Sequence, residues 1–204
     1  MAHLPAVRAS DAERERAVSA LREHCAEGRL DLEEFSSRVG EVYSARTSGE
    51  LEKALRELPP LAAPMRRRPK RLTLAVFGDF ERKGRWRVPR RTFVLSTFSD
   101  VDVDLRHAVV EKPIATVGVF ALFGNVDVYV PEGVEVDVGG IVVFGHRREW
   151  GPDTPPLMGT PLIRVRAFAL FGTIDVWRVP AGTTGGYGEI TRAVKRSSRE
   201  LPAG

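Results

Sequence analysis

Four carboxylates recur at the same place in a repeated motif, and their spacing is the feature of this sequence that could support chemistry. Each follows a phenylalanine by four positions, in stretches such as ALFGNVD and ALFGTID. The four are Glu81, Asp102, Asp127 and Asp175, and a further copy of the motif has Arg148 at that position. If the copies stack in register, these carboxylates form a row on one outer face, where neighbouring like charges invite a cation or a basic partner. The spacing matches neither the EF-hand loop nor the calcium-binding nonapeptide repeat. The alternative interpretation is therefore a row of solvated, outward side chains.

The other residue types that carry catalysis are scattered. The histidines His3, His24, His107 and His146 share no ligand spacing, and Cys25 is the single cysteine. Neither a phosphate-binding glycine loop nor a nucleophile elbow accompanies them. The sequence therefore predicts that the protein is not an enzyme and has no catalytic, cofactor-binding or metal-binding residues.

A cluster of basic residues lies in the proline-rich stretch PPLAAPMRRRPKR. Prolines lack the amide donor and favour an extended chain, so we predict a linker over residues 60–71. Three interpretations of its charge stay open: solvated linker charge, contact with anionic lipid headgroups or an acidic partner, and contact with nucleic acid. The basic residues are Arg66, Arg67, Arg68, Lys70 and Arg71.

The repeated motif predicts the fold of residues 72–181. Its phenylalanines recur at spacings of 21, 25, 21 and 27 residues, a coil length typical of stacked β architectures. Strand-like alternation follows most copies, and the glycine after the phenylalanine marks a bend. We therefore predict an all-β repeat domain, β-solenoid-like or a stacked sheet, with the phenylalanine rings facing the core. The residues of this structural repeat are Phe77, Gly78, Phe98, Phe123, Gly124, Phe144, Gly145, Phe171 and Gly172.

Two features of this region leave alternatives open. The fourth copy, FGHRREW, breaks the pattern, because Arg147 and Glu149 stand where the second, third and fifth copies have apolar residues. Trp86, Trp150 and Trp177 mark either a ligand surface or packing in the core or at an edge.

The first sixty residues predict a small helical module over residues 7–59. Ser10 and Glu13 form the capping box of a first helix, Asp31 caps a second, and a third begins near Ser48. Apolar residues recur every three or four positions in each segment. The chain is therefore predicted to be an α+β protein: a three-helix module, a basic proline-rich linker, the β repeat domain, and a flexible basic tail over 182–204. The alternative for the tail is that its basic residues, Arg192, Lys195, Arg196 and Arg199, dock on an acidic face.

The helical module resembles a known family. Its opening SDAERE, its central EGRLDLEEF and its closing ARTSGEL before Leu-Pro are similar to the short N-terminal domain of unknown function that is common in actinobacterial proteins. The central piece also resembles short helical oligomerisation motifs of other bacterial proteins, which implies that the chain could form a homo-oligomer.

The β region resembles a second family. FGNVDVYVPEGVEVDVGGIVVFG at 123–145 and the later ALFGTIDVWRVP are similar to the C-terminal domain of LiaF-type cell-envelope stress regulators. In that family the β domain follows membrane-spanning helices and is linked to the restraint of a sensor kinase. This chain departs from the family because no apolar run reaches the ~18 residues that a span requires.

Together these observations predict a cytoplasmic regulatory or scaffold protein whose β domain binds a protein partner. A role in cell-envelope stress, with a sensor kinase or membrane protein as the partner, is implied by the resemblance. One alternative is a nucleic-acid-binding regulator, which the net negative charge of the helical module disfavours. The other is a peripheral membrane adaptor that contacts anionic lipid through the basic linker.

Overall fold

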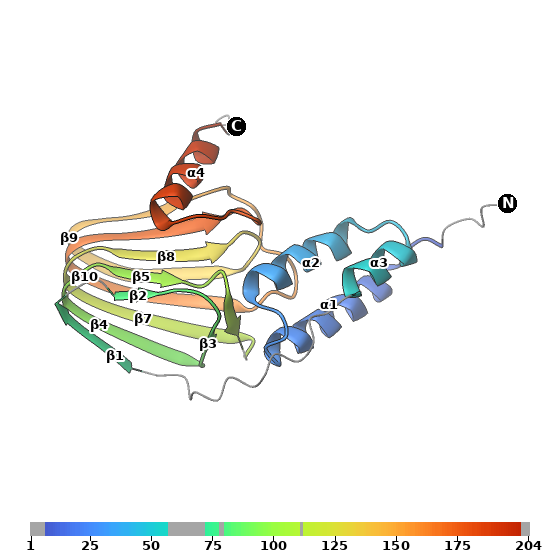
Figure 1. Cartoon of the computed structure of the whole chain (residues 1–204), viewed down its shortest axis with the longest axis horizontal. Coiled ribbons are helices and arrows are strands. Elements are labelled where there is room, and N and C mark those ends of the chain that lie inside the picture. The colour runs from blue at the N-terminus through green and yellow to red at the C-terminus, as the bar shows by residue number, and fades with distance from the viewer. Residues whose placement is uncertain (1–6, 57–71, 78–79, 111, 201–204) are drawn as a thin grey trace.

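The computed structural model describes residues 7–56, 72–77, 80–110 and 112–200 (Figure 1). The helical module begins with three segments that each start at a reciprocal capping box, in which the cap side chain accepts an amide hydrogen bond and a glutamate accepts one in return. The prediction of helices from these caps is confirmed. The segments are α1 (Asp11–Ala26), α2 (Leu32–Ser44) and α3 (Ser48–Leu55).

The β domain follows from residue 72, and all its strand pairs are parallel. Its strands are β1 (Leu72–Phe77), β2 (Phe80–Arg82), β3 (Trp86–Val88), β4 (Arg91–Phe98), β5 (Val101–Asp104), β6 (Ala108–Val110), β7 (Ile114–Phe123), β8 (Val126–Pro131), β9 (Val136–Trp150) and β10 (Leu162–Val179).

One long sheet curls around the core of this domain. Its order is β1-β4-β7-β10-β8-β5-β2, with β9 on the other side of β10, and β3 and β6 form a separate short pair. Strand β10 joins the two halves, because its first part pairs with β7 and its second part with β8. The α+β prediction is confirmed, with an all-β second domain. The curled sheet is closer to half a barrel than to a clear solenoid (Figure 1).

The last two copies of the repeat lie in the opposite order to the chain. β10 lies between β7 and β9, so the fifth copy is inside the sheet and the fourth is at its edge. In β10 the inward side chains Ile174 and Val176 are fully buried, whereas Arg147 and Glu149 of β9 are exposed. A charged pair at inward positions suits an edge strand. The copy that breaks the pattern is therefore the one that ends the stack.

The four repeat phenylalanines whose side chains the structure describes lie on the outside of the sheet, so the prediction that they face the core is wrong for these four. Their exposed fractions are 51% for Phe98, 40% for Phe123, 60% for Phe144 and 40% for Phe171. The inner side of the bend is lined by small, fully buried residues such as Ala121 and Ala169. The backbones approach closely there, and the rings stand outside.

The bend itself is as predicted. The glycine that follows the phenylalanine has a positive φ in three copies among the described residues: 137° at Gly124, 154° at Gly145 and 141° at Gly172. This left-handed backbone region favours glycine. After the bend the strand resumes with valine or isoleucine inward, so the core is mostly small and β-branched. Its fully buried members include Val101, Val117, Val126, Val128, Val165, Ile174 and Val176.

The helical module packs against one end of the β domain (Figure 1). The Ser36 hydroxyl donates to the carbonyl of Glu132 at 2.5 Å, and the Arg85 guanidinium donates to the carbonyl of Gly28 at 2.6 Å. Leu32 of α2 is fully buried within the core of the β domain. Direct contacts therefore hold the module in place. The predicted linker, 60–71, lies outside the described residues.

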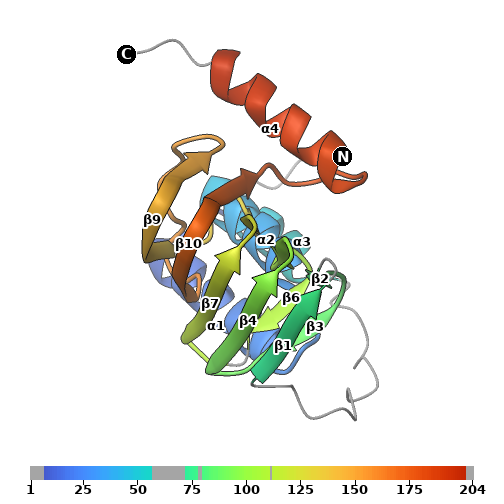
Figure 2. The ribbon, with the colours of Figure 1, turned by 90° about the vertical axis from the view of Figure 1, so that its left-hand side faces the viewer.

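The C-terminal segment differs from the flexible tail that the sequence predicts. It forms a helix, α4 (Tyr187–Glu200), because Ile190 and Val194, four residues apart, are both fully buried against the β domain. Figure 2 shows α4 crossing outside the sheet beyond β10. Within the part of the chain that the structure describes, no helix is long and apolar enough to cross a membrane.

Candidate protein-interaction site

An open apolar surface covers the outer side of β4, β7, the first part of β10 and the first part of β9. We call this surface the aromatic face. Alternation turns Phe93, Leu95, Phe120, Ile141 and Val143 outward. The repeat phenylalanines are out of that alternation and are exposed at the bend that ends each of these strand segments. The exposed members of the aromatic face are Phe93, Leu95, Phe98, Phe120, Phe123, Ile141, Val143, Phe144 and Phe171.

A continuous stack of rings forms one border of the aromatic face. The ring centroids of Phe98 and Phe123 are 4.9 Å apart, those of Phe123 and Phe171 are 5.0 Å apart, and those of Phe171 and Phe144 are 4.8 Å apart. The planes in these pairs are within 10° of parallel. These distances match the spacing of neighbouring strands, so the strict register of the repeat creates the stack.

A shallow groove of about 340 Å³ is lined by residues of β4, β7, β9 and β10 that precede the stacked rings in these strands. Phe120 and Phe168 stack in its floor with centroids 4.7 Å apart, and Ile141 is 64% exposed at its rim. The ring of Phe93 lies over Gly118, where an added Cβ would be only 2.5 Å from Cδ1 of that ring. The glycine therefore gives the groove its flat floor.

The second candidate surface carries the carboxylates that the sequence singled out. Strand pairing places Glu81 beside Asp102, Asp102 beside Asp127, and Asp127 beside Asp175, and Arg148 is paired with Asp175 at the end. The structure thus brings all the predicted carboxylates together as one row, which we call the acidic row. It lies on the outer side of β2, β5, β8 and the second part of β10.

Tryptophans from the same strands donate to the acidic row. Nε1 of Trp177 donates to Asp127 at 2.6 Å, and Nε1 of Trp150 donates to Asp175 at 3.0 Å. Burial raises the pKa of the Asp127 carboxyl above its ordinary value, and the Trp177 hydrogen bond opposes that rise. Among the described residues, no cluster of His, Cys, Asp and Glu side chains could hold a metal ion.

Helix α4 covers much of this second surface. Tyr187 stacks on Tyr129 of β8 with ring centroids 4.6 Å apart. At the other end of the contact, the Lys195 ammonium lies 5.0 Å from the ring centroid of Trp150 and 5.3 Å from that of Trp177. The acidic row is therefore partly enclosed, whereas the aromatic face is open.

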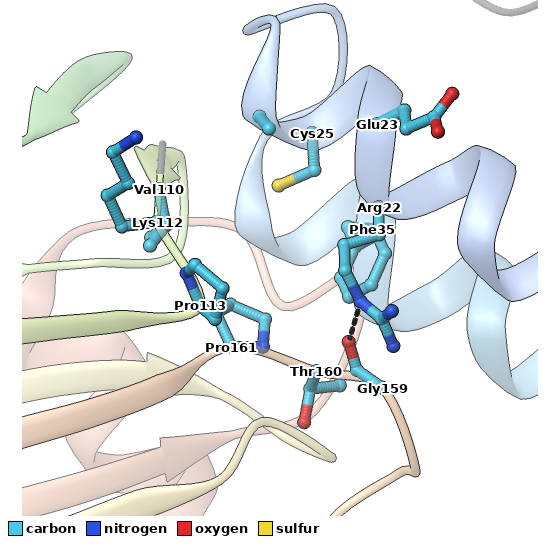
Figure 3. Close-up of a pocket in the computed structure, with 11 residues that line it drawn as sticks. Arg22, Glu23, Cys25, Phe35, Val110, Lys112, Pro113, Gly159, Thr160 and Pro161 are labelled. Atoms are coloured by element: carbon cyan, nitrogen blue, oxygen red, sulfur yellow. Dashed lines mark hydrogen bonds between the residues drawn. The ribbon is translucent and has the colours of Figure 1, made fainter.

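A cavity of about 350 Å³ lies between the helical module and the β domain (Figure 3). Arg22, Cys25, Lys112 and Pro161 are among its lining residues, and the Arg22 guanidinium donates to the carbonyl of Gly159 at 3.0 Å. Burial raises the pKa of the Cys25 thiol to about 11, so this thiol stays protonated at neutral pH. The walls of this cavity, formed by residues of both parts of the chain, are largely apolar.

Some predicted residues have no described side chain. The basic cluster, Arg66 to Arg71, and Gly78 lie outside the described residues. For Phe77 the structure describes the backbone alone, which pairs with Phe98 in β1 and β4. The proposed contacts of the basic cluster with lipid, protein or nucleic acid stay predictions.

Sequence reasoning missed the groove residues of the aromatic face. Phe93, Leu95 and Phe120 alternate with buried Val94 and Val119, a pattern that signals strands with two apolar faces. The repeat phenylalanines were identified from their spacing but placed on the wrong side. The sequence offers docking of the tail on an acidic face as an alternative, but the helix itself and its apolar contact with Tyr129 and Trp177 were missed, although Tyr187, Ile190 and Val194 have the spacing of an amphipathic helix.

Comparison with known proteins supports both parts of the chain. Residues 7–59 match the family described as the DUF1707 SHOCT-like domain, and residues 76–150 match the family described as cell wall-active antibiotics response LiaF, C-terminal. Both predicted resemblances are confirmed. In the structure the β repeat extends past the second match, to the end of β10.

Two relatives from Mycobacterium tuberculosis cover most of the chain. Uncharacterized protein Rv0966c of strain ATCC 25618 / H37Rv and Uncharacterized protein MT0994 of strain CDC 1551 / Oshkosh are each 31% identical over 181 residues, which is 85% of this chain and 89% of the relative. No solved structure matches the chain.

Proposed function

Because this chain belongs to the same family as these two mycobacterial proteins, with a DUF1707 SHOCT-like domain followed by a LiaF-like C-terminal domain, we propose that it is a non-enzymatic regulatory or scaffold protein of the cell-envelope stress response. It acts in the cytoplasm by binding a protein partner through the aromatic face. The partner implied by the family is a sensor kinase or another membrane protein.

The observation that carries this proposal is the size and order of the open aromatic face. Isolated apolar side chains on a surface are normal, but a contiguous apolar patch marks an interaction site. Here Phe98, Phe123, Phe171 and Phe144 form a stack whose members are each at least 40% exposed, and residues that precede them in the same strands line an apolar groove. Rigid aromatic side chains lose little conformational entropy when they bind, so they are favoured in protein interfaces.

The helical module has a different role in this proposal. Its apolar side chains are used internally or against the end of the β domain, with residues such as Leu21, Phe35 and Val39 fully buried. It closes one end of the curled sheet and leaves the aromatic face free. We therefore assign partner binding to the β domain.

The proposal is tested with a photo-crosslinking residue placed at position 143, on the aromatic face, in living cells. A specific crosslinked partner is expected in the otherwise native chain. The double variant Phe120→Ser with Phe144→Ser should lose at least about nine-tenths of that product, since interface aromatics each contribute about 2 kcal/mol or more. Met158→Ser is the matched control, because Met158 is 72% exposed and lies in the loop between β9 and β10.

A second experiment tests the stress response. Cells that lack the gene are challenged with a cell wall-active antibiotic and complemented with the native chain, the Phe120/Phe144 double variant or Met158→Ser. Restored tolerance with the native chain and Met158→Ser, and its loss with the double variant, are expected. If the double variant crosslinks and complements as well as the native chain, the aromatic face is not the functional surface.

A further inference from the structure

Helix α4 lies along the direction in which the strands stack. Its Tyr187 contacts Tyr129 of β8, and its Lys195 contacts Trp177 of β10 and Trp150 of β9. Eight residues of helix span about 12 Å, or about two and a half strand spacings, in agreement with this placement. The helix therefore crosses the strands (Figure 2) and contacts side chains from neighbouring copies of the repeat.

The contact has the two components of a helix recognised by a groove. Ile190 and Val194 form the apolar anchors and are fully buried with Trp177, Tyr129 and Val179. A groove usually recognises an amphipathic helix through apolar side chains at positions such as i and i+4.

Charge complements the apolar anchors. The indoles of Trp177 and Trp150, which donate to Asp127 and Asp175, lie next to the Lys195 ammonium of α4. Lys195 acts on the pKa of Asp127 as a favourable charge, and it lies over both tryptophan rings. The surface thus combines carboxylates with aromatic rings, both of which attract cations.

The connection to α4 lies outside the paired part of the sheet. Residues 180–186 follow the last strand as turns and irregular chain, and Gly182 and Gly185 have positive φ values of 74° and 118°. The Thr183 amide donates to the carbonyl of Pro180, and the Gly182 amide donates to Glu33. The pairing of β10 with β8 ends at Val179, before this connection.

From these contacts we propose that the surface formed by the acidic row with Tyr129, Trp150 and Trp177 is a binding site for a basic amphipathic helix of a partner protein. Helix α4 occupies it as an internal ligand. The partner helix that fits has two aliphatic anchors four residues apart and lysine or arginine beside them. Because this surface is separate from the aromatic face, the inference stands apart from the proposed function.

The test uses the full chain with α4 released. Ile190→Asp with Val194→Asp removes both anchors, and Gly188→Asp with Ala193→Asp is the matched control, since both of its positions are exposed and neither carries a cation. The probe is a fluorescent peptide with the native sequence of residues 183–204. We expect it to bind the released variant with a Kd in the micromolar range and to bind the native chain and the control at least about tenfold more weakly, since α4 competes in cis.

Variant peptides test the chemistry of recognition. Val194→Asp in the peptide should abolish binding, and Lys195→Glu should weaken it about three- to tenfold, a cation–π contribution of about 0.6–1.4 kcal/mol. Scrambled peptide should not bind. Equal binding by the Lys195→Glu peptide would overturn the charge part of the proposal.

A second form of the chain keeps the test decisive if the released variant misfolds. A protease site inserted in residues 183–186 allows cleavage of the folded full chain between β10 and α4. After dilution, the binding of labelled peptide measures how far the cleaved α4 dissociates and is replaced. The proposal is overturned if folded, opened chain fails to bind the peptide at about 100 μM, which corresponds to a binding free energy weaker than about −5.5 kcal/mol. It is also overturned if the opened chain forms an α4-exchanged dimer or binds anionic vesicles through α4 and takes up no peptide.

Discussion

The two outer faces of the β domain are built from the same repeat but have opposite relations to the rest of the chain. Before the bend, the outward residues form the aromatic face, which is open. After the bend, the outward residues form the acidic row and the Tyr129–Trp177–Trp150 cluster, which α4 covers. On the open face the exposed rings contact one another, whereas on the covered face the indoles donate to carboxylates and pack under a helix.

The difference between the two faces shows that rows of side chains from the same repeat can have different roles. In-register pairing places equivalent residues of the repeat side by side on neighbouring strands, so each outward position of the repeat forms a row of similar side chains. A row of phenylalanines gains from stacking and can stay open for a partner. A row of aspartates repels itself, and here indole donors and a basic helix compensate for that repulsion. The following four predictions test this comparison, in order of decreasing effect.

The bend between the two faces should be the most sensitive point. In Gly172→Ala the new Cβ would collide with the carbonyl oxygen of Gly124 on the adjacent strand, at a φ of 141°. We expect the free energy of unfolding to fall by about 3 kcal/mol or more, measured by chemical denaturation. Gly188→Ala in α4 is the control, because its Cβ would meet nothing within 4 Å, and it should be neutral or stabilise by up to about 1 kcal/mol. Equal stabilities would show that the bend tolerates a side chain.

Truncation of one ring on each face should reveal which face contributes to stability. Trp177 is 3% exposed and Phe144 is 60% exposed. Trp177→Ala should lower the free energy of unfolding by about 3–5 kcal/mol, whereas Phe144→Ala should lower it by about 1 kcal/mol or less. Denaturant melts of the two variants make the measurement. A larger loss for Phe144→Ala would mean that the aromatic face is structural.

The covered face should respond to pH through Asp127. Burial raises the pKa of this carboxyl in the folded chain, so the unfolded chain releases the proton more readily. The cost to stability is therefore full above the folded pKa and disappears below the ordinary value of 3.8. Asp127→Asn, which still offers an oxygen to Trp177, should raise the melting temperature at pH 7 by about 2–4 °C. The gain should shrink as the pH falls toward 4, and a gain that is constant with pH would contradict this explanation.

The smallest effect is expected at Lys195. Its removal in Lys195→Ala eliminates the cation–π contacts with Trp150 and Trp177, worth about 0.5–1 kcal/mol at an exposed site. Hydrogen exchange of the α4 amides should become about two- to fivefold faster, while exchange in β7 and β10 stays unchanged. Arg196→Ala, at the exposed neighbouring position, is the control. If the exchange rates of the α4 amides were unchanged in Lys195→Ala, the cation–π contacts of Lys195 would not stabilise the packing of α4.

Much of the architecture could be predicted from local signals. The capping boxes locate the starts of α1, α2 and α3, because a cap is a contact between residues three apart. The period of the Phe-Gly motif predicts the stacked strands, and the register of the acidic row follows from it. The charged FGHRREW copy also carries a signal for an edge strand, although the exchange of β9 and β10 could not be deduced without the pairing.

Two parts of the candidate sites could not be predicted, and both depend on which side of a strand faces inward. The rings of Phe123 and Phe171 lie outside because small residues line the inner side of the bend. Which residues line that side depends on the curvature of the whole sheet, and the curvature cannot be deduced from a single strand. Helix α4 forms because Ile190 and Val194 pack against Tyr129 and Trp177, which are more than fifty and more than ten residues away in the chain, respectively. Without that contact the segment is short, basic and marginal as a helix.

The sequence by itself determined the helical caps, the positive-φ glycines, the alternation of the strands and the presence of a carboxylate row, because each depends on residues close together or on an exact repeat. The tertiary structure alone decided that the phenylalanines form an open face and that α4 covers the aromatic residues beside the acidic row. It also decided that the strand of the fifth copy lies inside the sheet, while the strand of the fourth copy is at its edge. These outcomes depend on sheet curvature and on long-range burial, in which distant parts of the chain compete for the same apolar surface.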